Sequence, residues 1–95
     1  MGLAIGTVEL NSVASGVVAG DEMLKSADVK LLMAQPVCPG KYVLLVTGDT
    51  SSVETAVAAG KAAGRDKVVD SIIISSIAPE VIPAIMRSTA PKQRE

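Results

Sequence analysis

The residue best suited to chemistry is Cys38, the one cysteine among the 95 residues of the chain. It lies between Pro36 and Pro39 in the segment 35–41, and Gly40 follows directly. Two prolines stiffen a backbone and glycine permits a turn with positive φ, so this pattern predicts a rigid loop with the thiol at its tip. A lone cysteine is often a small buried apolar residue, but a loop tip flanked by prolines is a poor place to bury a side chain. Both interpretations, a buried packing residue and a functional thiol, stay open at this point.

Two kinds of thiol chemistry can be compared. Nucleophilic catalysis by Cys38 is disfavoured, because a thiolate is normally formed beside a base and the chain contains no histidine. Iron–sulfur clusters take about three or four thiolates, whereas one chain supplies a single cysteine. A loop on the rotation axis of a homo-oligomer would gather one copy of Cys38 from each subunit. The sequence therefore predicts that the protein is not an enzyme, and that any cluster is shared between subunits.

Composition excludes several other classes of protein. The single cysteine forms neither an intramolecular disulfide nor a zinc site, and the net charge of −1 lacks the basic surplus of nucleic-acid binders. No apolar run is long enough to span a membrane and the first residues carry no basic leader, so we expect a cytoplasmic protein. Hydrophobic residues make up 48% of the chain, but only one is aromatic. Small aliphatic side chains favour close packing of helices on a sheet over a ligand pocket.

The elements that would position Cys38 follow from hydrophobic periodicity and turn residues. We expect strands and helices, in chain order, as strand 3–10, helix 13–27, strand 29–37, strand 42–46, helix 52–65, strand 68–75 and a short helix from Pro79. The order β-α-β-β-α-β with a C-terminal helix is that of a ferredoxin-like α/β (α+β) fold. We expect one domain over residues 1–87 and a polar, disordered tail over residues 88–95.

Finer features of these elements are also predicted. A cap at Asn11–Ser12 should begin the first helix, and its apolar positions recur at helical offsets: Val13, Val17, Val18, Leu24 and Ala27. Ser51 and Glu54 fit a capping box for the second helix. The second helix should present small residues to the sheet: Val53, Ala56, Val57, Gly60, Ala63 and Gly64. Ile72, Ile73 and Ile74 are consecutive, which predicts a last strand buried on both faces.

With these elements placed, the chain resembles the shell proteins of bacterial microcompartments over residues 2–86. Four segments carry the resemblance: AIGTVEL at 4–10, AGDEMLKSADVKLL at 19–32, VLLVTGD at 43–49 and VETAVAAGKAAG at 53–64. The resemblance implies a cytoplasmic location in a microcompartment shell, a homo-hexamer, and packing edge to edge with other shell proteins. It also matches Lys25 to the lysine found at the edge between tiles. The family's Pro-Arg-Pro-His edge motif is missing, because residues 75–78 read Ser-Ser-Ile-Ala.

The resemblance also gives the cysteine loop a role. The loop between the second and third strands lines the central pore in this family, which implies a pore loop of Pro36, Val37, Cys38, Pro39, Gly40 and Lys41. Cys38 takes the first position of the Gly-Ser-Gly triplet of ordinary hexameric members. A Cys-Pro-Gly loop is similar to the iron–sulfur subgroup of propanediol-utilisation and glycyl-radical-enzyme compartments. This implies Cys38 as ligand of a shared iron–sulfur cluster, of 4Fe–4S type, which relays electrons across the shell or is delivered to an encapsulated redox enzyme.

Two alternative functions stay open. The first is a purely structural shell tile whose pore conducts small metabolites and holds no cluster. The second is a regulatory ferredoxin-like domain that binds a nucleotide between subunits. The chain lacks a phosphate-binding loop, since Thr55 and Ala62 stand where that motif needs a glycine and a hydroxyl residue around Gly60-Lys61. This argues against the nucleotide-binding alternative.

Overall fold

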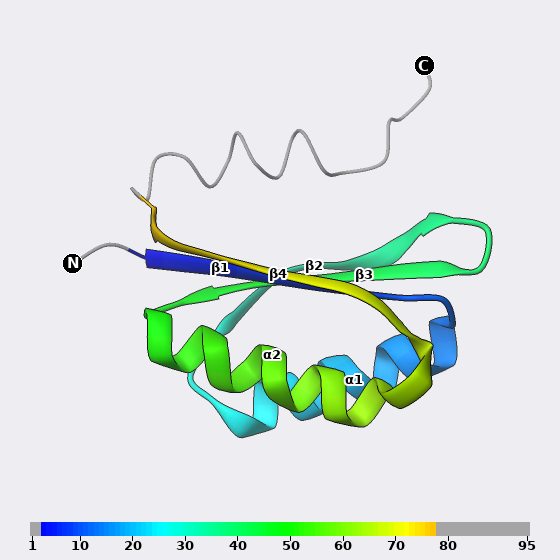
Figure 1. Cartoon of the computed structure of the whole chain (residues 1–95), viewed down its shortest axis with the longest axis horizontal. Helices are drawn as coiled ribbons and strands as arrows, with labels where there is room; N and C mark the ends of the chain where they lie inside the picture. Colours follow the sequence, from blue (N-terminus) through cyan, green and yellow to red (C-terminus); the bar gives the residue numbers. More distant parts are fainter. Residues whose placement is uncertain (1–2, 78–95) are drawn as a thin grey trace, which may run out of the picture.

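The computed structural model describes residues 3–77, which fold into a four-stranded sheet covered on one face by two helices (Figure 1). Its elements in chain order are β1 (Leu3–Leu10), α1 (Val13–Ser26), β2 (Lys30–Cys38), β3 (Lys41–Gly48), α2 (Thr50–Gly64), a short 3-10 helix η1 (Arg65–Lys67) and β4 (Val68–Ile77). The predicted C-terminal helix and tail lie outside the described residues.

The sheet has the strand order β2-β3-β1-β4, and all neighbouring strands are antiparallel. Each helix connects two strands that are not adjacent, and both helices lie on the same face of the sheet (Figure 1). This is the ferredoxin-like arrangement that the element order predicts. The fold class is therefore confirmed.

The main core lies between the sheet and the two helices. Its buried apolar side chains come from every layer: Ala4, Val8, Leu10, Ala19, Met23, Leu44, Val46, Val53, Ala56 and Val57. Glycine lets the backbones approach closely, since a Cβ at Gly6 of β1 would lie 2.6 Å from Val57 Cγ2 of α2. The predicted small-residue face of α2 is the face that packs on the sheet, where Val53, Ala56, Val57 and Gly60 are buried.

Helix α1 packs differently from the prediction. Ser12 caps it as expected, accepting a hydrogen bond from the Ser15 amide at 3.2 Å. Its buried residues, however, are the small or flexible ones, Gly16, Ala19, Gly20 and Met23. Four of the apolar positions that were expected to form its packing face are instead exposed: Val13, Val17, Val18 and Leu24. The helix approaches the sheet through its glycines, which turns the larger residues outward.

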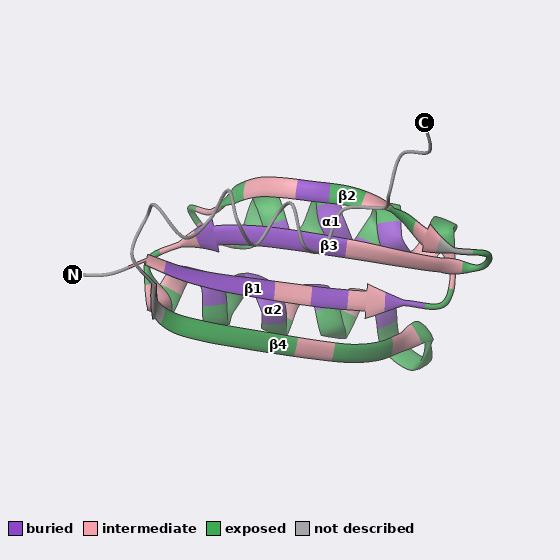
Figure 2. Cartoon of the chain, turned by 90° about the horizontal axis from the view of Figure 1, so that it is seen from above, coloured by how far each residue is buried: buried purple, intermediate pink, exposed green. Residues whose placement is uncertain are grey.

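The prediction that β4 is buried on both faces was wrong. Ile72, Ile73 and Ile74 are 51%, 39% and 48% exposed. The cause is the strand order, which places β4 at the edge of the sheet, while β1 and β3 occupy the buried centre (Figure 2). Consecutive isoleucines in this strand therefore indicate exposed apolar surface.

The start of α2 also differs from the prediction. The N-cap is Asp49, whose Oδ1 accepts a hydrogen bond from the Ser52 amide at 2.8 Å, and the helix begins at Thr50. Ser51 donates its hydroxyl to the same carboxylate at 3.2 Å. These bonds lower the pKa of Asp49 from its ordinary 3.8, with the Ser52 amide the largest cause. Because the Asp49 carboxylate caps the helix, the predicted Ser51–Glu54 capping box is not formed.

Candidate functional site

The predicted cysteine loop is the tip of a β-hairpin. Strand β2 continues to Cys38 and β3 begins at Lys41, so the turn itself consists of Pro39 and Gly40 alone. The loop is shorter than the sequence predicted, because Pro36, Val37 and Cys38 belong to one strand and Lys41 to the next. Pro36 is compatible with β2 because β2 is an edge strand, where proline is tolerated.

The turn has the backbone that its composition favours. Gly40 adopts φ of +79°, a left-handed conformation in which glycine avoids the steric cost of a side chain. Pro39 and Gly40 are both exposed, and no atom lies within 4 Å of where a Gly40 Cβ would stand. Figure 1 shows this hairpin projecting past the end of the helical layer. The predicted glycine turn is present, and Cys38 pairs with Lys41 across it.

An ion pair joins this hairpin to the centre of the sheet. Lys41 Nζ lies 3.5 Å from Glu9 Oε2, which belongs to β1. Sequence reasoning missed Glu9, because a contact between positions so far apart in the chain depends on the antiparallel register of β1 and β3. Lys41 thus places a positive charge at the strand position opposite Cys38, and the negative charge of Glu9 lies next to it.

A hollow of about 320 Å³ lies next to the hairpin on the face of the sheet that α1 and α2 do not cover. Its lining residues are Thr7, Glu9, Val37, Val43, Asp70 and Ile72. Glu9 and Asp70 are direct neighbours across β1 and β4. Two carboxylates in this position repel each other, and Lys41 compensates part of that charge. Val37 is the hairpin residue that borders this hollow.

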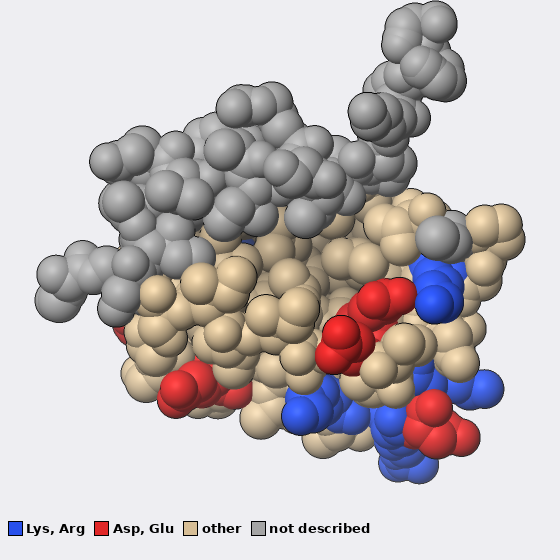
Figure 3. Space-filling view, turned by 45° about the horizontal axis from the view of Figure 1, so that its top comes forward, with Lys and Arg blue, Asp and Glu red and all other residues tan. Residues whose placement is uncertain are grey.

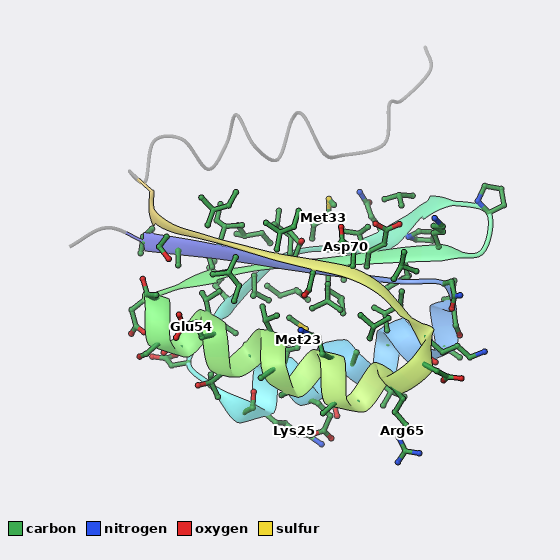
Figure 4. All side chains as sticks on the ribbon, in the orientation of Figure 1. Met23, Lys25, Met33, Glu54, Arg65 and Asp70 are labelled. Atoms are coloured by element: carbon green, nitrogen blue, oxygen red, sulfur yellow. The ribbon has the colours of Figure 1, made fainter. Side chains whose placement is uncertain are left out.

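Lys25 lies far from the hairpin, in the last turn of α1 (Figure 4). Its Nζ is 2.9 Å from Asp21 Oδ2, one helical turn earlier, and both side chains are exposed. The hydrogen bond that Lys25 donates to Asp21, together with the charges of Asp21 and Glu22, raises the pKa of Lys25 from its ordinary 10.5. The structure thus separates the two predicted functional positions, and Lys25 is a charged residue on the outer surface.

Within residues 3–77, no three His, Cys, Asp or Glu residues are grouped closely enough to hold a metal ion. In the same range, no helix is long and apolar enough to cross a membrane. On the face shown in Figure 3, acidic and basic side chains of the described residues are interspersed, without a large patch of one sign. One copy of this part of the chain therefore lacks a full metal-ligand set.

The conserved pattern of the BMC domain family matches residues 4–77, which includes every element from β1 to β4. The chain belongs to the BMC domain family. It is 47% identical over 85 residues to the bacterial microcompartment shell protein PduT of Citrobacter freundii, an alignment that covers 90% of this chain and 46% of PduT. It is 36% identical over 88 residues to the carboxysome shell protein CsoS1 of Prochlorococcus marinus, covering 90% of this chain and 85% of CsoS1.

A solved structure agrees with the fold of this BMC domain. The crystal structure of a microcompartments protein from Desulfitobacterium hafniense DCB superposes with a TM-score of 0.87 at 43% sequence identity. The match covers 100% of this chain and 53% of that one. The BMC chain thus spans about half the length of PduT and of the D. hafniense protein. The predicted family is confirmed: this is a BMC-domain shell protein, similar to the shell proteins PduT and CsoS1.

Proposed function

We propose that the BMC chain assembles into a homo-hexameric tile that packs edge to edge with other shell proteins. The support is the apolar surface that a single chain leaves exposed on two sides of the molecule. On one side are the valines of α1, above the β2 half of the sheet, and on the other are the isoleucines of edge strand β4. Exposed apolar patches of this kind mark protein interfaces. Two different patches on one chain suit head-to-tail contacts, which close into a ring.

The hairpin tip would then line the central pore of the ring. A two-residue turn allows little conformational freedom, and the Lys41–Glu9 ion pair ties its base to β1. Copies of this hairpin around an axis would bring their Cys38 residues together. Residues 3–77 of one chain contain no group of side chains that could hold a metal ion. A metal site at Cys38 would therefore need ligands from several subunits.

Cys38 would serve there as the thiolate ligand of a shared iron–sulfur cluster, of 4Fe–4S type. A cluster of this kind supplies one-electron transfer when it is bound. The chain would contribute the thiolate and backbone amides of residues 38–41 as hydrogen-bond donors to sulfur, which tune the reduction potential. Lys41 adds a positive charge beside an anionic site, offset in part by Glu9. The function would be to relay electrons across the shell, or to deliver the cluster to an enzyme inside.

The symmetry of the ring limits occupancy. A cubane cluster has no sixfold axis, and it takes about three or four thiolates. In a hexamer, some copies of Cys38 would therefore remain unligated. We expect at most one cluster for each ring, with iron well below one cluster for each chain.

The observation that carries this proposal is the position of the single cysteine beside the exposed two-residue turn. It is tested by anaerobic reconstitution with iron and sulfide, followed by iron analysis and visible absorbance. The wild-type protein should bind iron and absorb broadly through sulfur-to-iron charge transfer, and Cys38→Ser should lose both while keeping its oligomeric mass. Val37→Ser is the matched control, because it adds a hydroxyl on the same strand and leaves the thiol. An assembled protein that takes up no iron would instead favour a structural tile with a metabolite-conducting pore.

A further inference from the structure

A groove runs along one edge of the molecule, between α1 and the edge strand β2. It has a volume of about 190 Å³, and Asp21 is the one charged residue among the described residues that line it. The larger apolar side chains that border it come from both elements: Val17 and Leu24 of α1 and Leu31 of β2. Val17 and Leu24 are 58% and 43% exposed. In the part of the chain that the structure describes, this apolar groove is therefore open to solvent.

The opposite edge of the sheet is β4, which carries Ile73 (Figure 2). This side chain is 39% exposed, and the residue pairs with Gly6 of β1. Gly6 faces α2, since a Cβ there would lie 2.6 Å from Val57 Cγ2. Residues directly opposite each other on neighbouring strands share one face of a sheet. Ile73 therefore stands at the free edge on the helix-covered face, the same face on which the groove lies.

The register of the sheet places Ile73 and the groove in one row. Gly6 pairs with Ile73 on one side and with Val46 on the other. Val46 in turn pairs with Leu31, which lines the groove. Subunits of a ring are related by rotation about its axis, so positions at equal distance from the axis meet where two subunits join. With the hairpin tip at the axis, Ile73 of one copy would meet Leu31 of the next.

We propose that Ile73 of one copy fills the groove between α1 and β2 of a second copy. The proposal rests on the proposed ring assembly, and it names the contact that joins neighbouring chains. An isoleucine side chain has four carbon atoms, each about the size of a water molecule of roughly 30 Å³, so the groove has room for it. The inserted residue and the groove lie on opposite edges, so the contact is head-to-tail and closes into a ring when it is repeated.

Charge complementarity supports a second copy as the occupant. Asp21 lines the groove on α1, and Lys61 lies on α2. The residue before Asp21 lies against Leu44 of β3, and the residue before Lys61 lies against Val8 of β1. Leu44 and Val8 pair directly, so the acidic and the basic residue occupy the same level along the strands.

Lys61 lies on the side of α2 that is turned away from α1. Ala59 and Ala63 line the hollow between the two helices. Successive helical residues are rotated by about 100°, so Lys61, two residues from each alanine, faces the β4 side. A neighbouring copy would bring its Lys61 to Asp21, beside the existing pair of Asp21 with Lys25. Exposed ion pairs contribute little to affinity, so this pair would fix the orientation of the copies, and the apolar contact would hold them together.

A charge introduced on either side of the junction tests the contact. Ile73→Asp alters the inserted residue and Val17→Asp alters the groove, so each should convert the ring to monomers in size-exclusion chromatography with light scattering. Val18→Asp is the matched control, because Val18 is 55% exposed on the same helix but lines the hollow between the helices. It should keep the oligomeric mass of the wild type. Unchanged rings in Ile73→Asp, or equal behaviour of Val17→Asp and Val18→Asp, would overturn the proposal.

Mixing the two altered chains gives a second readout. The Ile73→Asp chain keeps an intact groove and the Val17→Asp chain keeps an intact Ile73, so together they can form one junction but no closed ring. At high protein concentration, the proposal predicts a heterodimer in the mixture and no dimer from either variant alone. A contact between two like edges cannot be restored in this way, so a mixture that stays monomeric would overturn the head-to-tail assignment.

Ile73→Ala takes the place of Ile73→Asp if that variant does not fold. Loss of a packed interface side chain should raise the concentration at which the ring dissociates by about tenfold, and Val18→Ala should leave it unchanged. Failure of this contact is distinguishable from failure of the proposed function. A wild-type ring that survives Ile73→Asp would overturn the contact alone, whereas a wild-type assembly of other than six chains that Ile73→Asp breaks would overturn the hexamer alone.

Discussion

Cys38 and Lys41 face each other across a turn of only two residues, Pro39 and Gly40. The thiol-bearing position is therefore fixed to the sheet by the backbone pairing of β2 with β3. The opposite position carries a lysine whose ammonium group contacts Glu9 of β1 at 3.5 Å. A loop held in this way can present one residue at a constant place in every subunit of a ring.

Gly40 should be sensitive to any side chain. Its φ of +79° is unfavourable for other residues, and Gly40→Ala should lower the free energy of unfolding by about 1–2 kcal/mol. Open space surrounds the position, so the loss would come from the backbone and not from a clash. Chemical denaturation measures it, with Pro39→Ala as the control at the other turn position. Unchanged stability in Gly40→Ala would show that the turn adopts another conformation in solution.

Gly6 should be sensitive for a different reason. A Cβ there would lie 2.6 Å from Val57 Cγ2 and 2.7 Å from Val53 Cγ1, both on stiff β-branched side chains. Gly6→Ala should therefore cost about 1–3 kcal/mol of unfolding free energy through overpacking. Gly20→Ala should cost less, because its Cβ would meet the flexible end of Leu44 at 3.0 Å. Adding Val57→Ala to Gly6→Ala should recover part of the loss, and a fully additive double-mutant cycle would contradict this packing.

The Asp49 cap should make stability depend on pH in the acidic range. Hydrogen bonds from Ser52 and Ser51 lower the pKa of Asp49 in the folded state below its ordinary 3.8. The folded state therefore binds this proton less readily than the unfolded state, and the contribution of the carboxylate is lost as pH falls through its folded pKa. Asp49→Asn keeps an N-cap residue without the charge, so its stability should fall less between neutral and acidic pH. Parallel pH profiles for the two proteins would contradict the assignment of the cap.

Lys25 should affect contacts between tiles and leave the ring intact. It lies exposed in the last turn of α1, where it pairs with Asp21 on the same helix. Lys25→Ala should weaken two-dimensional sheets seen by electron microscopy without changing the oligomeric mass. Lys61→Ala is the matched control, an exposed lysine in the last turn of α2. If Lys25→Ala yields monomers, this residue belongs to the ring interface instead.

Local pattern predicted much of this fold. The strand and helix order, the Ser12 cap and the small-residue face of α2 all follow from periodicity and capping chemistry, which act over a few residues. The glycine turn after Cys38 follows from the Pro39-Gly40 sequence in the same way. These features do not depend on which strands become neighbours.

The errors arose where strand order decides the outcome. Ile72, Ile73 and Ile74 have the pattern of a central strand, but the sheet places them at its edge. Val17 and Val18 have the spacing of a packing face, yet Gly16 and Gly20 allow closer contact with the sheet and take that place. The Glu9–Lys41 pair likewise depends on register, which no local signal in the sequence reveals.

The central claim is that copies of Cys38 around one axis hold an iron–sulfur cluster. Native mass spectrometry of anaerobically purified protein tests it most directly, because it reports the number of subunits and the bound iron in the same particle. The account predicts a ring of six chains that carries the mass of one cluster, and a Cys38→Ser ring of the same size without it. A wild-type ring free of iron and sulfide after reconstitution, or a cluster retained by Cys38→Ser, would contradict the account.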